Sequence, residues 1–99
     1  MMRQDKQYRI TIEALDADKT VIQTLQFEHQ DREDLFNVVD KLQRGSGLES
    51  ETATKVGVAL RLLGPVLMQN RKHALFTDFM PHFKHFMHHL KSTVKHAVN

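Results

Sequence analysis

The segment from Val56 to Met68, VGVALRLLGPVLM, constrains the fold of this chain more than any other stretch. It is the most apolar run in the sequence, and its apolar residues fall on two helical stripes rather than one. A helix that is apolar over so much of its circumference must be covered by neighbours on at least two sides. The run is too short for a membrane span, which needs about 20 apolar residues, and Arg61 interrupts it. The segment therefore predicts the central helix of a compact helical core.

Two segments nearer the N-terminus alternate apolar and polar residues, as half-buried strands do. The first is residues 7–15, QYRITIEAL, and the second is residues 20–28, TVIQTLQFE, in which Ile22 breaks the alternation. The DADK sequence between them is typical of a turn, because aspartate side chains bond nearby backbone groups. We therefore predict an antiparallel β-hairpin over about residues 7–28. Two strands alone are marginally stable, so the apolar face needs cover, and both edges are open to pairing with another chain.

Three amphipathic segments follow, and we predict helices over about residues 32–44, 51–72 and 78–96. Asp31 is a suitable N-cap for the first helix, and Ser50 for the second. The predicted fold is α+β: a two-stranded antiparallel β-hairpin followed by three helices packed around the central apolar helix.

Length and composition favour a single domain spanning residues 1–99. The chain has no cysteine, which excludes a disulfide framework, a thiolate zinc site and a cysteine nucleophile. No apolar leader segment precedes the first strand, so we expect a cytoplasmic protein without a membrane association.

Six of the seven histidines lie after residue 72, most of them in the last predicted helix. His85 and His89 are four residues apart, a spacing that can place two imidazoles on one metal ion, and His82 lies one turn earlier. A functional Zn²⁺ or Ni²⁺ site needs further ligands, and Asp78 is the nearest acid. Solvated histidines are the simpler interpretation, and a divalent-metal site is the alternative.

Charge is distributed unevenly along the chain. Residues 1–50 carry a formal charge of −3 (7 Lys/Arg, 10 Asp/Glu), and residues 51–99 carry +5 (7 Lys/Arg, 2 Asp/Glu). A basic half can attract nucleic acid, but the phenylalanines have core spacing and offer no stacking platform. A solvated basic face is the simpler interpretation, and weak nucleic-acid binding is a third hypothesis. The candidate basic surface consists of Lys84, Lys91, Lys95, Arg71 and Lys72.

No pattern of catalytic residues is present in the sequence. A nucleophile with an adjacent base, a glycine-rich phosphate loop and a carboxylate pair are all missing. We therefore predict that the protein is not an enzyme and uses no cofactor. The favoured hypothesis is a small cytosolic interaction or accessory protein with an unidentified protein partner, and a homodimer formed through the exposed hairpin edge is one form of it.

Three motifs give the second half of the chain a recognisable order: GVALRLLGPVLM, RKHALF and PHFKHFMHHLK. With weaker support from YRITIEAL and LQFE, the chain resembles a small family of bacterial proteins catalogued only as a domain of unknown function. The resemblance implies a β-hairpin with helices, and it implies no activity, substrate or cofactor. The histidines at 85, 88 and 89 lie outside what the resemblance explains.

Overall fold

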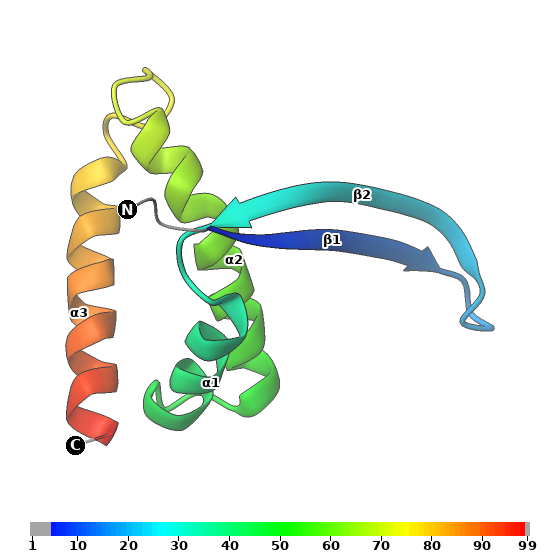
Figure 1. Ribbon diagram of the computed structural model, residues 1–99, viewed down its shortest axis with the longest axis horizontal. Coiled ribbons are helices and arrows are strands. Elements are labelled where there is room, and N and C mark those ends of the chain that lie inside the picture. Colours follow the sequence, from blue (N-terminus) through cyan, green and yellow to red (C-terminus); the bar gives the residue numbers. More distant parts are fainter. Residues whose placement is uncertain (1–4, 99) are drawn as a thin grey trace. The chain divides into compact units, whose positions relative to one another are not determined.

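The computed structural model describes residues 5–98 as two compact units, of which the first ends at Asp34 and the second begins at Leu35. The first unit is an antiparallel hairpin and the second is helical (Figure 1). The predicted α+β class and the order of hairpin and three helices are confirmed. That the two units form a single domain stays a prediction. The elements are β1 (Lys6–Leu15), β2 (Val21–Asp31), α1 (Leu35–Gly45), α2 (Ser50–Gln69) and α3 (Met80–Val98).

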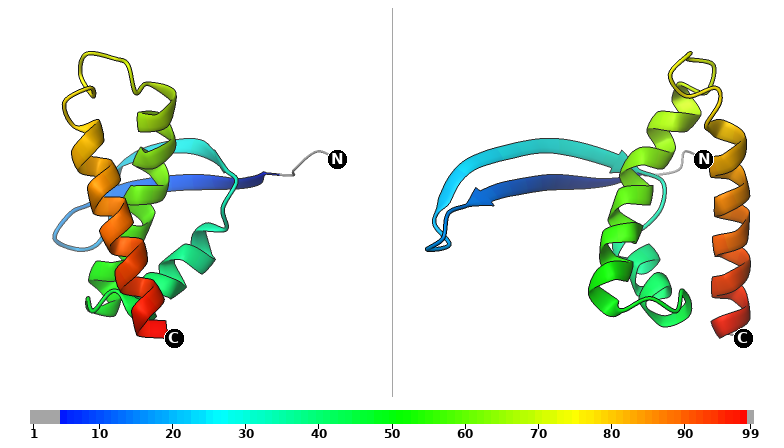
Figure 2. Two further views of the ribbon diagram at one scale, coloured as in Figure 1. Left: turned by 90° about the vertical axis from the view of Figure 1, so that its left-hand side faces the viewer. Right: turned by 180° about the vertical axis from the view of Figure 1, so that it is seen from behind.

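The register of the hairpin gathers its apolar residues on one face. Ile10 pairs with Phe27 and Ile12 with Leu25, and directly opposed residues of an antiparallel pair share a face. The register shifts between Ala14 and Leu15, and it leaves Ile22 without an opposite residue. The residue that breaks the sequence alternation is therefore the extra residue of a β-bulge. Figure 2 shows the two strands curving together along their length.

The predicted turn between the strands is organised by Asp16. Its carboxylate Oδ1 accepts hydrogen bonds from the backbone N–H of Asp18 at 2.8 Å and of Thr20 at 3.0 Å. The Asp16 N–H donates to the Thr20 carbonyl at 3.0 Å, which closes the turn. Lys19 lies at a φ of 67°, a left-handed conformation that costs a non-glycine residue about 1–2 kcal/mol. The hydrogen bonds around Asp16 offset that cost.

In the helical unit, α1 approaches both of its neighbours at glycines. A Cβ atom on Gly57 of α2 would lie 3.1 Å from Val39 Cγ2 and 3.2 Å from Leu42 Cδ1 of α1. A Cβ atom on Gly45 of α1 would lie 3.2 Å from the Cα atom and the carbonyl oxygen of Val94 in α3. At Gly45 the tight neighbours include backbone atoms, so a larger side chain would push α3 away, whereas at Gly57 they are side-chain ends of α1 that would have to shift.

The centre of the α2–α3 packing is a cluster of three buried residues, Leu67, Met80 and Phe83. The partly buried Leu60, Phe76 and Met87 surround this cluster. The rest of the apolar surface is less completely covered than the sequence predicts. The exposed fraction is 41–47% for Leu63, Val66 and Met68 of α2. It is 44% both for Phe79, which directly precedes α3, and for Phe86 within α3.

The helix boundaries differ from the predicted ones for local reasons. α1 begins at Leu35 rather than near residue 32, because the Asp31 carboxylate accepts the Glu33 N–H at 3.0 Å within a turn instead of capping the helix. Ser50 is the first residue of α2 and not its cap, since the Ala53 N–H donates to the Glu49 carbonyl at 2.8 Å. Over residues 5–98, no helix combines the length and apolarity that crossing a membrane requires.

Candidate protein-interaction surface

The structure places the candidate metal ligands His82, His85 and His89 on the exposed surface of α3. Within residues 5–98, no group of three or more histidine, cysteine, aspartate and glutamate side chains is arranged to hold a metal ion. His85 and His89 retain the spacing of a two-ligand pair, which is fewer ligands than a structural or catalytic zinc site uses. The metal site therefore stays a prediction from the sequence.

The candidate basic residues divide between two places. Lys84, Lys91 and Lys95 lie along one stripe of α3, and all three are exposed. Arg71 and Lys72 are exposed in the connection between α2 and α3. Nucleic-acid binding by these five residues also stays a prediction.

The most prominent surface of the hairpin is its apolar face. Ile12 is 54% exposed, Leu25 is 60% exposed and Phe27 is 40% exposed, although the sequence pattern predicts all three as inward-facing. Contiguous exposed apolar residues of this kind mark interaction sites in soluble proteins, because burying them gains about 25 cal/mol per Å². The alternation identifies the face correctly, but it carries no information on what covers the face.

The opposite face of the hairpin is polar and internally bonded. Arg9 Nε donates to Glu28 Oε2 at 3.0 Å, and Gln26 Nε2 donates to Thr11 Oγ1 at 3.1 Å. The Arg9 and Glu28 side chains are 67% and 65% exposed, so the pair adds at most about 1 kcal/mol to stability. The hairpin is thus distinctly two-faced, with an apolar and a solvated side.

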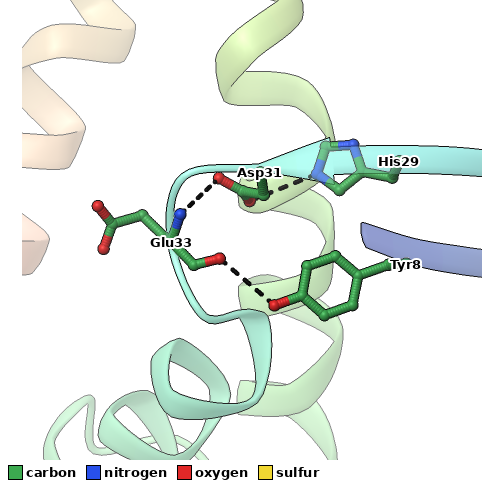
Figure 3. Close-up of polar contacts among 4 residues, drawn as sticks. All are labelled: Tyr8, His29, Asp31 and Glu33. Atoms are coloured by element: carbon green, nitrogen blue, oxygen red, sulfur yellow. Dashed lines mark hydrogen bonds and ion pairs between the residues drawn. The ribbon is translucent and has the colours of Figure 1, made fainter. Parts of the chain in front are cut away.

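The base of the hairpin is closed by four residues (Figure 3). His29 Nε2 lies 3.4 Å from Asp31 Oδ2, and the Tyr8 hydroxyl donates to the Glu33 carbonyl at 3.4 Å. The rings of Tyr8 and His29 stack with centroids 6.3 Å apart. Asp31 is only 3% exposed, and its other carboxylate oxygen accepts the Glu33 N–H. We interpret this cluster as structural, because it fastens the ends of both strands to the turn that follows β2.

Sequence reasoning missed this cluster. It assigned Asp31 to a helix cap and did not connect this residue with Tyr8. The signal that could have found it is the hairpin register, which sets Tyr8 directly opposite His29.

Replacing Asp31 by alanine is expected to lower the stability of the hairpin base by about 1–3 kcal/mol, because the Glu33 N–H loses its acceptor. Hydrogen exchange at the Glu33 amide, measured together with urea unfolding, reports this change. The matched control is Asp31→Asn, which retains an acceptor oxygen and should lose less. Equal protection of the Glu33 amide in the wild type and Asp31→Ala would contradict the assignment.

Comparisons with known proteins identify relatives but no activity. A family model described as a domain of unknown function with solved structure (DUF3861) matches residues 6–92. A crystal structure of a protein of unknown function from Pectobacterium atrosepticum is similar to this chain, with a TM-score of 0.79 and 35% sequence identity. The similarity covers 90% of this chain and 99% of that one. A comparison with curated proteins found no match.

Proposed function

The chain belongs to the DUF3861 family, a domain of unknown function, and from this premise we propose that it is a small non-enzymatic protein-interaction module whose β-hairpin is the binding element. One observation supports the proposal above all others: the apolar face of the hairpin is exposed at Ile12, Leu25 and Phe27. An isolated two-stranded hairpin is marginal in water, and a partner that covers this face would stabilise it.

The hairpin suits a specific mode of recognition. A partner strand can add to a sheet edge through main-chain hydrogen bonds, while side chains of alternate residues determine which partner fits. Here the alternate residues are Tyr8, Ile10 and Ile12 on β1, with Phe27 and Leu25 opposite the last two. A partner bound in this way would extend the sheet and bury the apolar face at the same time.

The proposal assigns no catalytic residue and no cofactor to the chain, and it places the protein in the cytoplasm. The Asp31–His29 pair is the arrangement closest to an acid–base pair among the hairpin residues, and its contacts with the adjacent turn give it a structural role.

The experiment compares proteins retained by three tagged forms of the chain. The wild type is set beside a face variant that carries Leu25→Thr and Phe27→Thr, which keeps residues of high β-propensity in the strand. A matched control carries Thr24→Ser and Gln26→Thr on the opposite face of the same strand. We expect the face variant to lose its partner by about tenfold or more, since each buried Leu or Phe contributes about 1.5–3 kcal/mol.

Quantitative affinity purification measures the retained protein, and far-UV circular dichroism checks that all three forms remain folded. The control should retain the wild-type level of partner. If the same proteins bind equally well to the wild type and the face variant, the hairpin is not the binding element.

A further inference from the structure

We propose that the hairpin binds a second copy of this chain, and that the two copies pair along the outer edge of β1 about a two-fold axis through Thr11. The inference rests on the proposed function, because it names the occupant of the hairpin. Within the part of the chain that the structure describes, β1 pairs with β2 on one side and with no strand on the other. Its outer edge therefore offers a row of backbone N–H and C=O groups to another strand. Pairing would convert two marginal hairpins into one four-stranded antiparallel sheet.

Symmetry restricts the register of such a pair. If the two-fold axis passes through a residue of β1, the positions of the apolar face (Tyr8, Ile10, Ile12 and Ala14) lie opposite positions of the same face in the second copy. If the axis passes between two residues, each apolar position faces a polar one, because side chains alternate with a period of two. Axes through residues therefore keep one continuous apolar face across all four strands.

Charge then selects one axis among these. The charged side chains on the polar face of β1 are Arg9 and Glu13. An axis through Thr11 places Arg9 directly opposite Glu13 of the second copy, and Glu13 opposite its Arg9. An axis through Ile10 or Ile12 leaves both charges opposite uncharged residues. Axes through Arg9 or Glu13 bring like charges together, which is destabilising for directly opposed residues.

The existing contacts of these two side chains fit this arrangement. Arg9 already bonds Glu28 within its own hairpin, and its guanidinium group has donors to spare for a second carboxylate. Glu13 lies opposite Thr24 in the hairpin, and its side-chain carboxylate makes no hydrogen bond or ion pair with any residue in the 5–98 range. The second copy thus supplies the cation that Glu13 lacks.

The apolar face is continuous in the same register. Ile10 lies opposite Ile12 of the second copy, and each already has a large apolar neighbour on β2, Phe27 and Leu25 respectively. In the four-stranded sheet, Phe27 and Ile10 of one copy therefore line up with Ile12 and Leu25 of the other in one continuous apolar row. The two-fold axis generates a second, identical row. Tyr8, a large residue, lies opposite the small Ala14.

The outer edge of β2 does not offer the same complementarity. β2 contains the acids Glu28 and Asp31 but no lysine or arginine, so self-pairing of β2 gives no such ion pair. Pairing β1 of one copy with β2 of another is heterologous, and a dimer made this way does not close. A closed dimer with matched charges therefore uses β1 on both sides.

Sedimentation of the purified chain of 99 residues at micromolar concentration tests the proposal, and we expect a dimer. Charge-reversal variants are compared in a Glu28→Gln background, so that residue 9 faces a neutral side chain in its own hairpin. Arg9→Glu alone and Glu13→Arg alone should each weaken the dimer by about tenfold or more, because each makes both cross-copy pairs like-charged.

Two rescue measurements make the register specific. A one-to-one mixture of the Arg9→Glu and Glu13→Arg chains should form a heterodimer, because both of its cross-copy pairs are again of opposite charge. The double variant Arg9→Glu with Glu13→Arg should recover the homodimer in the Glu28→Gln background. A cross-strand nuclear Overhauser contact between Ile10 and Phe27 confirms in each case that the hairpin is intact.

Either of two outcomes overturns the inference. A wild-type chain that stays monomeric with an intact hairpin shows that the second copy is not the partner. A dimer that is indifferent to all the charge reversals lies on another surface. Failure of the proposed function has a different result: the variant with Leu25→Thr and Phe27→Thr would then keep its partners.

Discussion

Replacing Leu67 by alanine is expected to lower the free energy of unfolding of the helical unit by about 3 kcal/mol. Leu67 belongs to α2 and is 1% exposed, and its side chain packs against Met80 and Phe83 of α3. Truncation removes apolar contacts and leaves a cavity that close-packed neighbours fill only in part. Urea unfolding followed by circular dichroism at helical wavelengths measures the change.

Leu63→Ala is the matched control for this prediction. It is the same substitution on the same helix, but Leu63 is 41% exposed and should cost less than about 1.5 kcal/mol. Equal losses for the two variants would show that the α2–α3 contact is not centred on Leu67.

A valine at Gly57 is expected to lower the free energy of unfolding by about 1–3 kcal/mol, although glycine is itself a poor helix former. The added Cβ atom would lie 3.1 Å from Val39 Cγ2 and 3.5 Å from the Val39 Cα atom. The 3.5 Å distance is an ordinary contact for Cβ alone, but valine adds two γ-methyl groups beyond Cβ, so the Val39 and Leu42 side chains must shift to accommodate them. Urea unfolding measures the loss, and hydrogen exchange along α1 locates it.

Ala59→Val provides the comparison for the Gly57 variant. It places the same β-branched residue at an exposed position of α2, so it reports the helix-propensity cost without the steric one. The Gly57→Val chain should be the less stable of the two. If it proves more stable than wild type, the α1–α2 distance is adjustable and the glycine is not required.

The sequence predicts the elements of this fold and their faces, because both depend on periodicity. The alternation in the two strands identifies the face that carries Ile10 and Phe27, and the irregularity at Ile22 marks the bulge. Which other element or partner packs against a face depends on tertiary structure. The spacing of apolar residues along a strand or a helix carries no information about it. Phe27 and Phe86 were therefore predicted as core residues, and both remain 40% or more exposed.

Local hydrogen bonding also competes with the signals for helix ends. Asp31 has the chemistry of an N-cap, but its carboxylate bonds a backbone N–H only two residues away and so belongs to the hairpin. The residues at the base of the hairpin show the same limit. The stacking of Tyr8 on His29 can be predicted only once the register of the two strands is known.

The bulge at Ile22 sets a limit on how far a sheet built from this hairpin can grow. A dimer joined through β1 still has β2 at both outer edges, and a regular outer strand is a template for filaments. The extra residue bends β2 and disrupts its ladder near the turn, so an incoming strand cannot match its full length. The irregularity therefore favours a sheet of finite width over the open-ended addition of further strands.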